Sequence, residues 1–129
     1  MSLLAALCLV AGGMRVEIPA NNFTLRWQHS IEKIDWEEDY ILVGAWLFLS
    51  GARVRGSGAG MEPPAGAYFD SGRWHYRPVP DMRWTQQLRL TRSEFARDYE
   101  LCVAGACQPL YRWVPVAAGT TVAIPCQPS

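Results

Sequence analysis

The feature that most constrains the fold is the alternation of apolar and polar residues in "NFTLRWQHSIE", residues 22–32. One set of alternate positions is almost entirely apolar: Phe23, Leu25, Trp27, His29 and Ile31. The positions between them carry polar side chains. Successive side chains of a β-strand point to opposite faces, so a period of two predicts a half-buried strand.

The rest of the chain is also strand-like. Similar β-prone segments are "DWEEDYILVG", "AWLFLSGARVR", "RWHYR", "MRWTQQLRLTR", "DYELCV" and "QPLYRWVPV", and nine prolines and eleven glycines punctuate the chain. Only "TRSEFARDY" predicts a helical turn, with Thr91 or Ser93 as its cap. The pattern predicts an all-β fold with little helix, a single antiparallel β-sandwich or small β-barrel over residues 14–129.

The hydrophobic content and the charge balance indicate whether the chain folds and which partners it can bind. Half of the 129 residues are hydrophobic and 19% are charged, which favours a folded core over disorder. Twelve basic and twelve acidic residues cancel, and no run of like charge resembles a nucleic-acid-binding arm. We therefore expect neither a nucleic-acid partner nor an acidic-membrane partner.

The amino terminus differs from the rest of the chain. "SLLAALCLVAGG" carries no charge, and Arg15 is the first ionic residue. A helix of about twelve residues would reach ~18 Å, short of the ~30 Å hydrocarbon core of a bilayer. Residues 1–13 resemble the apolar region of a secretory signal, with small residues near a cleavage point. This predicts a leader and export to the periplasm or cell envelope; a buried first strand or helix is the alternative.

The cysteines fit an exported protein. Cys102 and Cys107 flank "VAGA", a short turn that would bring them opposite each other in a hairpin. We therefore predict a structural disulfide between them, since a redox pair normally has two intervening residues and zinc would need further ligands nearby. Cys126 would have no partner if Cys8 were removed with the leader.

The segment "RVRGSGAGMEPPAG" interrupts the strand pattern. Gly56, Gly58 and Gly60 occupy alternate positions, where positive φ angles can align successive N–H groups as an anion-binding nest. Arg53 and Arg55 could add charge for a carboxylate or phosphate. The segment lacks the ending of a phosphate loop and the spacing of a dinucleotide fingerprint. A structural loop over one end of a barrel is the alternative to a ligand site.

His29 lies on the apolar side of the first predicted strand. An inward imidazole needs a hydrogen-bond partner, and Glu37 on the next strand is a candidate. A structural pair, a ligand site and a general acid/base pair all stay open. We expect no metal or other cofactor, because the acids after His29 lack a calcium-loop pattern and His75 is the only other histidine.

Three blocks resemble, in order, segments of a bacterial family of domains of unknown function: "TLRWQHSIEKIDWEEDYIL", "GARVRGSGAGMEPPAGA" and "YELCVAGACQPL". The members are small exported proteins encoded beside, or fused to, TAXI-type TRAP transporters, which are tripartite ATP-independent periplasmic uptake systems. The resemblance covers about residues 17–112 and leaves a tail at residues 113–129. Residues 29–32 match the family's "HS-hydrophobic-E" segment, and residues 56–60 match its glycine-rich segment.

The resemblance implies an envelope location and an accessory role in solute uptake, with no established reaction. The expected function is a non-catalytic protein that binds TRAP-type transporter membrane or solute-binding subunits, or a small organic anion. The candidate ligand-binding residues are His29, Glu32, Glu37, Arg53, Arg55, Gly56, Gly58 and Gly60. The alternatives are an envelope enzyme with His29 and Glu37 as an acid/base pair, and a structural domain that docks through exposed aromatics such as Trp113.

Overall fold

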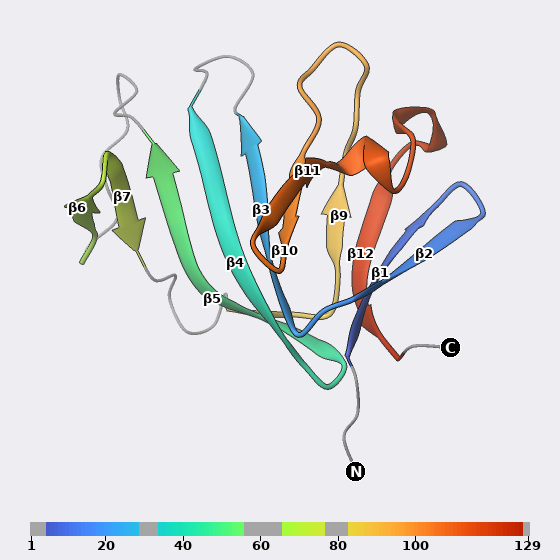
Figure 1. Ribbon diagram of the computed structural model, residues 1–129, viewed down its shortest axis with the longest axis horizontal. Coiled ribbons are helices and arrows are strands. Elements are labelled where there is room, and N and C mark those ends of the chain that lie inside the picture. The colour runs from blue at the N-terminus through green and yellow to red at the C-terminus, as the bar shows by residue number, and fades with distance from the viewer. Residues whose placement is uncertain (1–4, 29–33, 56–65, 77–82, 128–129) are drawn as a thin grey trace.

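Two antiparallel β-sheets make up most of the structure, a computed structural model that describes residues 5–28, 34–55, 66–76 and 83–127 (Figure 1). The small sheet has the order β2-β1-β12-β9: β1 (Ala6–Ala11), β2 (Met14–Pro19), β9 (Leu88–Leu90) and β12 (Thr121–Cys126). The large sheet has the order β11-β10-β3-β4-β5-β7-β6, with β8 also paired to β5: β3 (Asn22–Gln28), β4 (Asp35–Val43), β5 (Trp46–Arg55), β6 (Tyr68–Asp70), β7 (Arg73–Tyr76), β8 (Trp84–Thr85), β10 (Glu100–Val103) and β11 (Ala106–Pro109).

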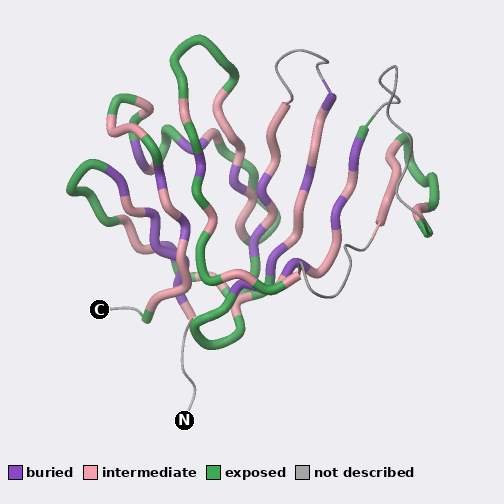
Figure 2. Tube along the Cα trace, turned by 180° about the vertical axis from the view of Figure 1, so that it is seen from behind, coloured by how far each residue is buried: buried purple, intermediate pink, exposed green. Residues whose placement is uncertain are grey.

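The core lies between the two sheets. Leu7 and Leu9 of β1 belong to the same buried cluster as Phe23 and Leu25 of β3 and Leu101 of β10. Figure 2 shows the buried stretches on both sheets. We call the side of the large sheet that carries this cluster the inner face, and the opposite side the outer face. The described strands form two open sheets rather than a closed barrel, so the predicted all-β fold is confirmed in its sandwich form.

The apolar amino terminus forms a buried strand, the alternative that the sequence left open. β1 lies between β2 and β12, and Leu7, Cys8 and Leu9 are at most 1% exposed. The small residues expected near a cleavage point form the β1–β2 turn, where Gly12 and Gly13 have φ values of 50° and 83°. Removal of residues 1–13 stays a prediction, and it would take away one of the two inner strands of the small sheet.

Both disulfides link neighbouring strands. Cys102 and Cys107 lie directly opposite each other across the β10–β11 turn, with Cα atoms 3.9 Å apart, which confirms the predicted bond. In the chain that keeps Cys8, Cys126 is bonded to it, with Cα atoms 5.9 Å apart, so Cys126 would lack a partner only if residues 1–13 were removed. The sequence did not reveal the second bond because it placed Cys8 in a leader rather than in the fold.

The segment predicted as a helical turn, residues 91–99, is a loop. The backbone N–H of Phe95 donates to Ser93 Oγ at 3.1 Å, which supports a single turn. A buried ion pair between Arg92 and Asp98, with Nη2–Oδ2 at 2.7 Å, closes the base of the loop. Two short 3₁₀ helices follow: η2 (Leu110–Arg112) and η3 (Val116–Ala118). In the described ranges, no helix has the length and apolar character needed to cross a bilayer.

Candidate functional site

The candidate site lies on the outer face of the large sheet. Paired residues of adjacent strands point to the same face, so alternate positions gather there. Arg26 of β3 is opposite Glu37 of β4. Glu37 is also opposite Arg53 of β5, and Arg53 is opposite His75 of β7. Four neighbouring strands thus place charged or ionisable side chains in one row across the sheet.

Glu37 is the centre of this row and is only 7% exposed. Its Oε2 lies 3.0 Å from Nε of Arg26. Its Oε1 lies 3.2 Å from Nε of Arg53 and 3.1 Å from Nη1 of Arg73. A buried carboxylate costs a large desolvation free energy unless cations and donors surround it; the three guanidinium groups supply the positive charge, and Arg53 donates a hydrogen bond.

Asp39 extends the network along β4. Arg53 donates to both oxygens of Asp39, from Nη1 at 2.5 Å and from Nη2 at 2.6 Å, and the Thr24 hydroxyl donates at 2.7 Å. Burial raises the pKa of Asp39, but the hydrogen bonds from Arg53 and Thr24 and the nearby positive charge outweigh it and hold the pKa below its usual value. We call the ionic network of Arg26, Glu37, Asp39, Arg53 and Arg73 the outer-face cluster.

A β-bulge in β5 makes this arrangement possible. Asp39 pairs with Gly51, and the next residue of β4 pairs with Leu49, so Ser50 is the extra residue. Leu49 and Arg53 have the same parity and would share a face in a regular strand. Because Ser50 shifts the register, Leu49 packs in the core while Arg53 reaches the outer face. The Ser50 hydroxyl also donates to the backbone oxygen of Asp39 at 3.2 Å.

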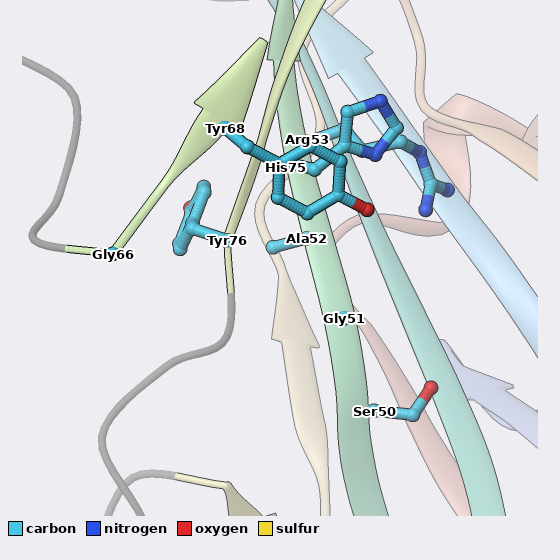
Figure 3. A pocket seen from close by; sticks show the side chains of 8 residues that line it. All are labelled: Ser50, Gly51, Ala52, Arg53, Gly66, Tyr68, His75 and Tyr76. Carbon is cyan, nitrogen blue, oxygen red and sulfur yellow. The ribbon is translucent and has the colours of Figure 1, made fainter. Parts of the chain in front are cut away.

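A cleft of about 470 Å³ adjoins the outer-face cluster and is lined mainly by residues of β5, β6 and β7. Its lining residues are Ser50, Gly51, Ala52, Arg53, Gly66, Tyr68, His75 and Tyr76. Figure 3 shows Tyr68, His75 and Arg53 grouped together, with the β5 backbone passing behind the Tyr68 ring toward Gly51 and Ser50. The rings of Tyr68 and His75 stack with centroids 5.0 Å apart, and Nε2 of His75 lies 3.2 Å from the backbone oxygen of Asp70.

The structure brings together two of the predicted ligand-binding residues, Glu37 and Arg53. Arg55 ends β5 on the same face, opposite Asp35, and is exposed. The remaining predicted residues lie outside the described residues: His29, Glu32, Gly56, Gly58 and Gly60. The partners that the structure shows for Glu37 are arginines, whereas the sequence suggested a histidine.

Several contributors to the site were not foreseen from the sequence: Arg26 as a partner of Glu37, and Arg73, Tyr68 and His75. The sequence does contain a pattern that points to the ionic network. Acids at positions 35, 37 and 39 alternate along β4, and arginines at 53 and 55 alternate along β5, the next strand of the same hairpin. Trp113, a predicted docking residue, instead packs against the core.

The arrangement is better suited to binding than to proton transfer. Both oxygens of Glu37 are paired with arginines, and Oε1 accepts a hydrogen bond from Nε of Arg53, so a substrate has little access to this carboxylate as a base. Among the residues that the structure describes, no three His, Cys, Asp or Glu side chains are grouped as a metal site. What the site offers is a fixed guanidinium beside an open cleft.

Comparison with known proteins gives one match. A family described as a domain of unknown function, DUF1850, matches residues 23–110. The chain belongs to the DUF1850 family. No protein of curated function and no solved structure shows significant similarity to the chain. The DUF1850 segment spans the large sheet with the outer-face cluster and its cleft, whereas β1, β2 and β12 of the small sheet lie outside it.

Proposed function

We propose that this DUF1850 protein is a non-catalytic, exported accessory protein of solute uptake that binds a small organic anion in the cleft beside the outer-face cluster. The observation that carries this proposal is the position of Arg53, which lines the cleft while Glu37 and Asp39 hold its guanidinium. The ligand class is a small carboxylate.

Arg53 retains donors for a ligand. Among the described residues, Glu37 uses one of the five N–H groups of Arg53 and Asp39 uses two, which leaves two for a carboxylate. The hydrogen bonds to Asp39 raise the pKa of Arg53 in spite of its partial burial, so its positive charge is permanent. Because the side chain is already fixed, binding costs little of its rotamer entropy.

The other walls of the cleft suit the body of such a ligand. Tyr68 supplies aromatic surface, and in the described part of the chain Nδ1 of His75 and the hydroxyl of Tyr68 have no hydrogen-bond partner. The volume of about 470 Å³ falls within the range of roughly 300–1,000 Å³ that is typical of small-molecule sites. A small carboxylate with a planar or apolar body would use both the charge and the rings.

Titration calorimetry with a panel of small mono- and dicarboxylates tests this site. We expect binding by the wild type, no binding of the corresponding neutral amides, and affinity about tenfold weaker or worse for Tyr68→Ala and His75→Ala. Phe95→Ala, in the distant loop, is the matched control and should bind like the wild type. A wild-type protein that binds no carboxylate, or that binds amides equally well, would contradict the proposal.

We further propose that the partner system is a TRAP-type transporter, contacted through its membrane or solute-binding subunits. The support is the resemblance of three sequence blocks to proteins encoded beside TAXI-type transporters. The test is a pull-down from the envelope fraction with the wild-type chain and with Arg55→Ala, which alters an exposed end of β5. We expect transporter subunits with the wild type and fewer with the variant. If the wild-type chain recovered no transporter subunit, the proposal of a TRAP-type partner would be contradicted.

A further inference from the structure

The β4–β5 hairpin carries an apolar surface that the cleft does not use. Five outer-face side chains form what we call the hairpin patch: Ile41, Val43, Trp46, Phe48 and Trp84. Strand pairing places Val43 beside Trp46, and the rings of Phe48 and Trp84 lie 4.6 Å apart. All members except Phe48 are 41–48% exposed, so the patch is a continuous apolar surface rather than scattered residues.

The hairpin patch reaches a projecting end of the molecule. Val43 and Trp46 flank the Gly44 turn, and Figure 1 shows this hairpin at the end from which both chain termini leave. A groove of about 360 Å³ lies between the hairpin and those terminal segments. Its lining residues are Ala5, Leu42, Gly44, Ala45, Pro125, Cys126 and Gln127. Among the described residues that line this groove, no side chain carries a charge.

An arginine lies at one border of the hairpin patch, and at the other border Asp39 is neutralised by its ion pair with Arg53. The Arg83 guanidinium lies 4.3 Å above the Phe48 ring, and its Nε donates to the backbone oxygen of Leu49 at 2.9 Å. The patch itself contains no acidic side chain. An apolar tip that carries Trp46 from β5 and Trp84 from β8, with an arginine at its border, is the combination that favours an interface between water and anionic lipid.

We propose that the hairpin end docks on a phospholipid bilayer, with Val43 and Trp46 among the headgroups and upper acyl chains. A bilayer surface accommodates a convex apolar tip, whereas a protein partner would need a matching concave pocket. The uncharged groove beside the tip can take part of an acyl chain. Arg53 is seven residues along β5 from Trp46, which places the anion cleft about 20 Å above the lipid surface.

Co-flotation with vesicles of phosphatidylethanolamine and phosphatidylglycerol tests this docking. We expect the wild type to float with the vesicles, and Val43→Ser/Trp46→Ser to partition about tenfold more weakly or worse, because apolar area no longer leaves water. Phe95→Ser is the matched control: it removes a 94% exposed aromatic from another loop and should float like the wild type. Near-ultraviolet circular dichroism verifies that the double variant is folded.

A second variant separates insertion from simple adhesion. Trp46→Phe keeps an apolar ring, so it should still float, but fluorescence quenching by lipids brominated on the upper acyl chain should decrease. The proposal would be overturned if the wild type did not float with the vesicles. It would also be overturned if Val43→Ser/Trp46→Ser and Phe95→Ser reduced flotation equally. A dimer that Val43→Ser/Trp46→Ser abolishes would overturn it too, since the occupant of the patch would then be a second copy of the chain. Anion binding in the cleft is measured separately and does not depend on this result.

Discussion

Glu38 and Asp39 are neighbours on β4, yet their pKa values shift in opposite directions. Glu38 points to the inner face, where burial raises its pKa although the Tyr40 hydroxyl donates to it at 2.8 Å. Asp39 points to the outer face, where Arg53 and Thr24 overcome the effect of burial and lower its pKa. The alternation of the strand therefore decides which carboxyl group resists ionisation and which favours it.

Glu38→Gln tests the raised pKa of the Glu38 carboxyl group on the inner face. A folded-state pKa above the unfolded value means that the wild type loses stability as pH rises from about 4.5 through the raised pKa of Glu38. The amide cannot ionise, so this loss should disappear in Glu38→Gln. Urea unfolding at a series of pH values measures it. Parallel pH profiles for the two proteins would contradict the prediction.

Asp39→Asn tests the outer-face cluster. Because the pKa of Asp39 is lowered on folding, its stabilisation is present at neutral pH and is lost as pH falls through the folded-state pKa, below about pH 4. We expect Asp39→Asn to lower the free energy of unfolding by about 1–2 kcal/mol at pH 7, and by less in acid. Asp70→Asn, at an exposed acid, should change it by less than about 0.5 kcal/mol. Equal effects of the two substitutions would argue against the network.

At the scale of elements, the sequence predicted what local patterns control. Alternation identified β3 and its buried face, and the spacing of Cys102 and Cys107 identified the β10–β11 hairpin. The bulge at Ser50 was not predictable, because only the pairing of β5 with β4 reveals the extra residue. Of the outer-face cluster, the sequence suggested Glu37 and Arg53, whereas Arg26 and Arg73 were missed because only the pairing of β3 and β7 with the hairpin brings them to Glu37.

The β10–β11 hairpin gives an element-scale prediction. Cys102→Ser/Cys107→Ser opens a bond between residues only five positions apart, so the unfolded chain gains little freedom. We expect a loss of about 2 kcal/mol in the free energy of unfolding, with the fold retained. Denaturant unfolding measures this loss, and collapse of the whole fold would contradict it.

At the scale of the whole molecule, β1 decides whether the sandwich can form. An uncharged apolar run of this length suits a leader and a buried strand equally well, and composition cannot separate them. The decisive information is non-local: β12, from the other end of the chain, pairs with β1 and supplies the partner of Cys8. The overall fold class was therefore predictable, and the role of its first strand was not.

The Cys8–Cys126 bond should be worth more than the hairpin bond. It joins residues 118 positions apart, and its loss would free most of the unfolded chain. We expect Cys8→Ser/Cys126→Ser to lower the free energy of unfolding by about 4–5 kcal/mol, roughly twice the cost at β10–β11. Parallel denaturation of both double variants makes the comparison, and a smaller effect at the long-range bond would contradict it.

Deleting residues 1–13 tests the role of β1 directly. The chain beginning at Met14 lacks an inner strand of the small sheet and leaves Cys126 as a free thiol. We expect no cooperative unfolding transition and one reactive thiol per chain. A cooperative transition of wild-type stability would show instead that the remaining strands suffice, and would favour the leader.

The bond between β1 and β12 also determines how the protein responds to force. The Cα atoms of Cys8 and Cys126 are 5.9 Å apart, although nearly the entire chain lies between them. A load applied to the two termini passes from one sulfur to the other and does not strain the sheets. Under oxidising conditions the domain thus acts as a short, inextensible joint between whatever is attached to its ends. A reductant would convert the same domain into an extensible one, whose strands then bear the tension.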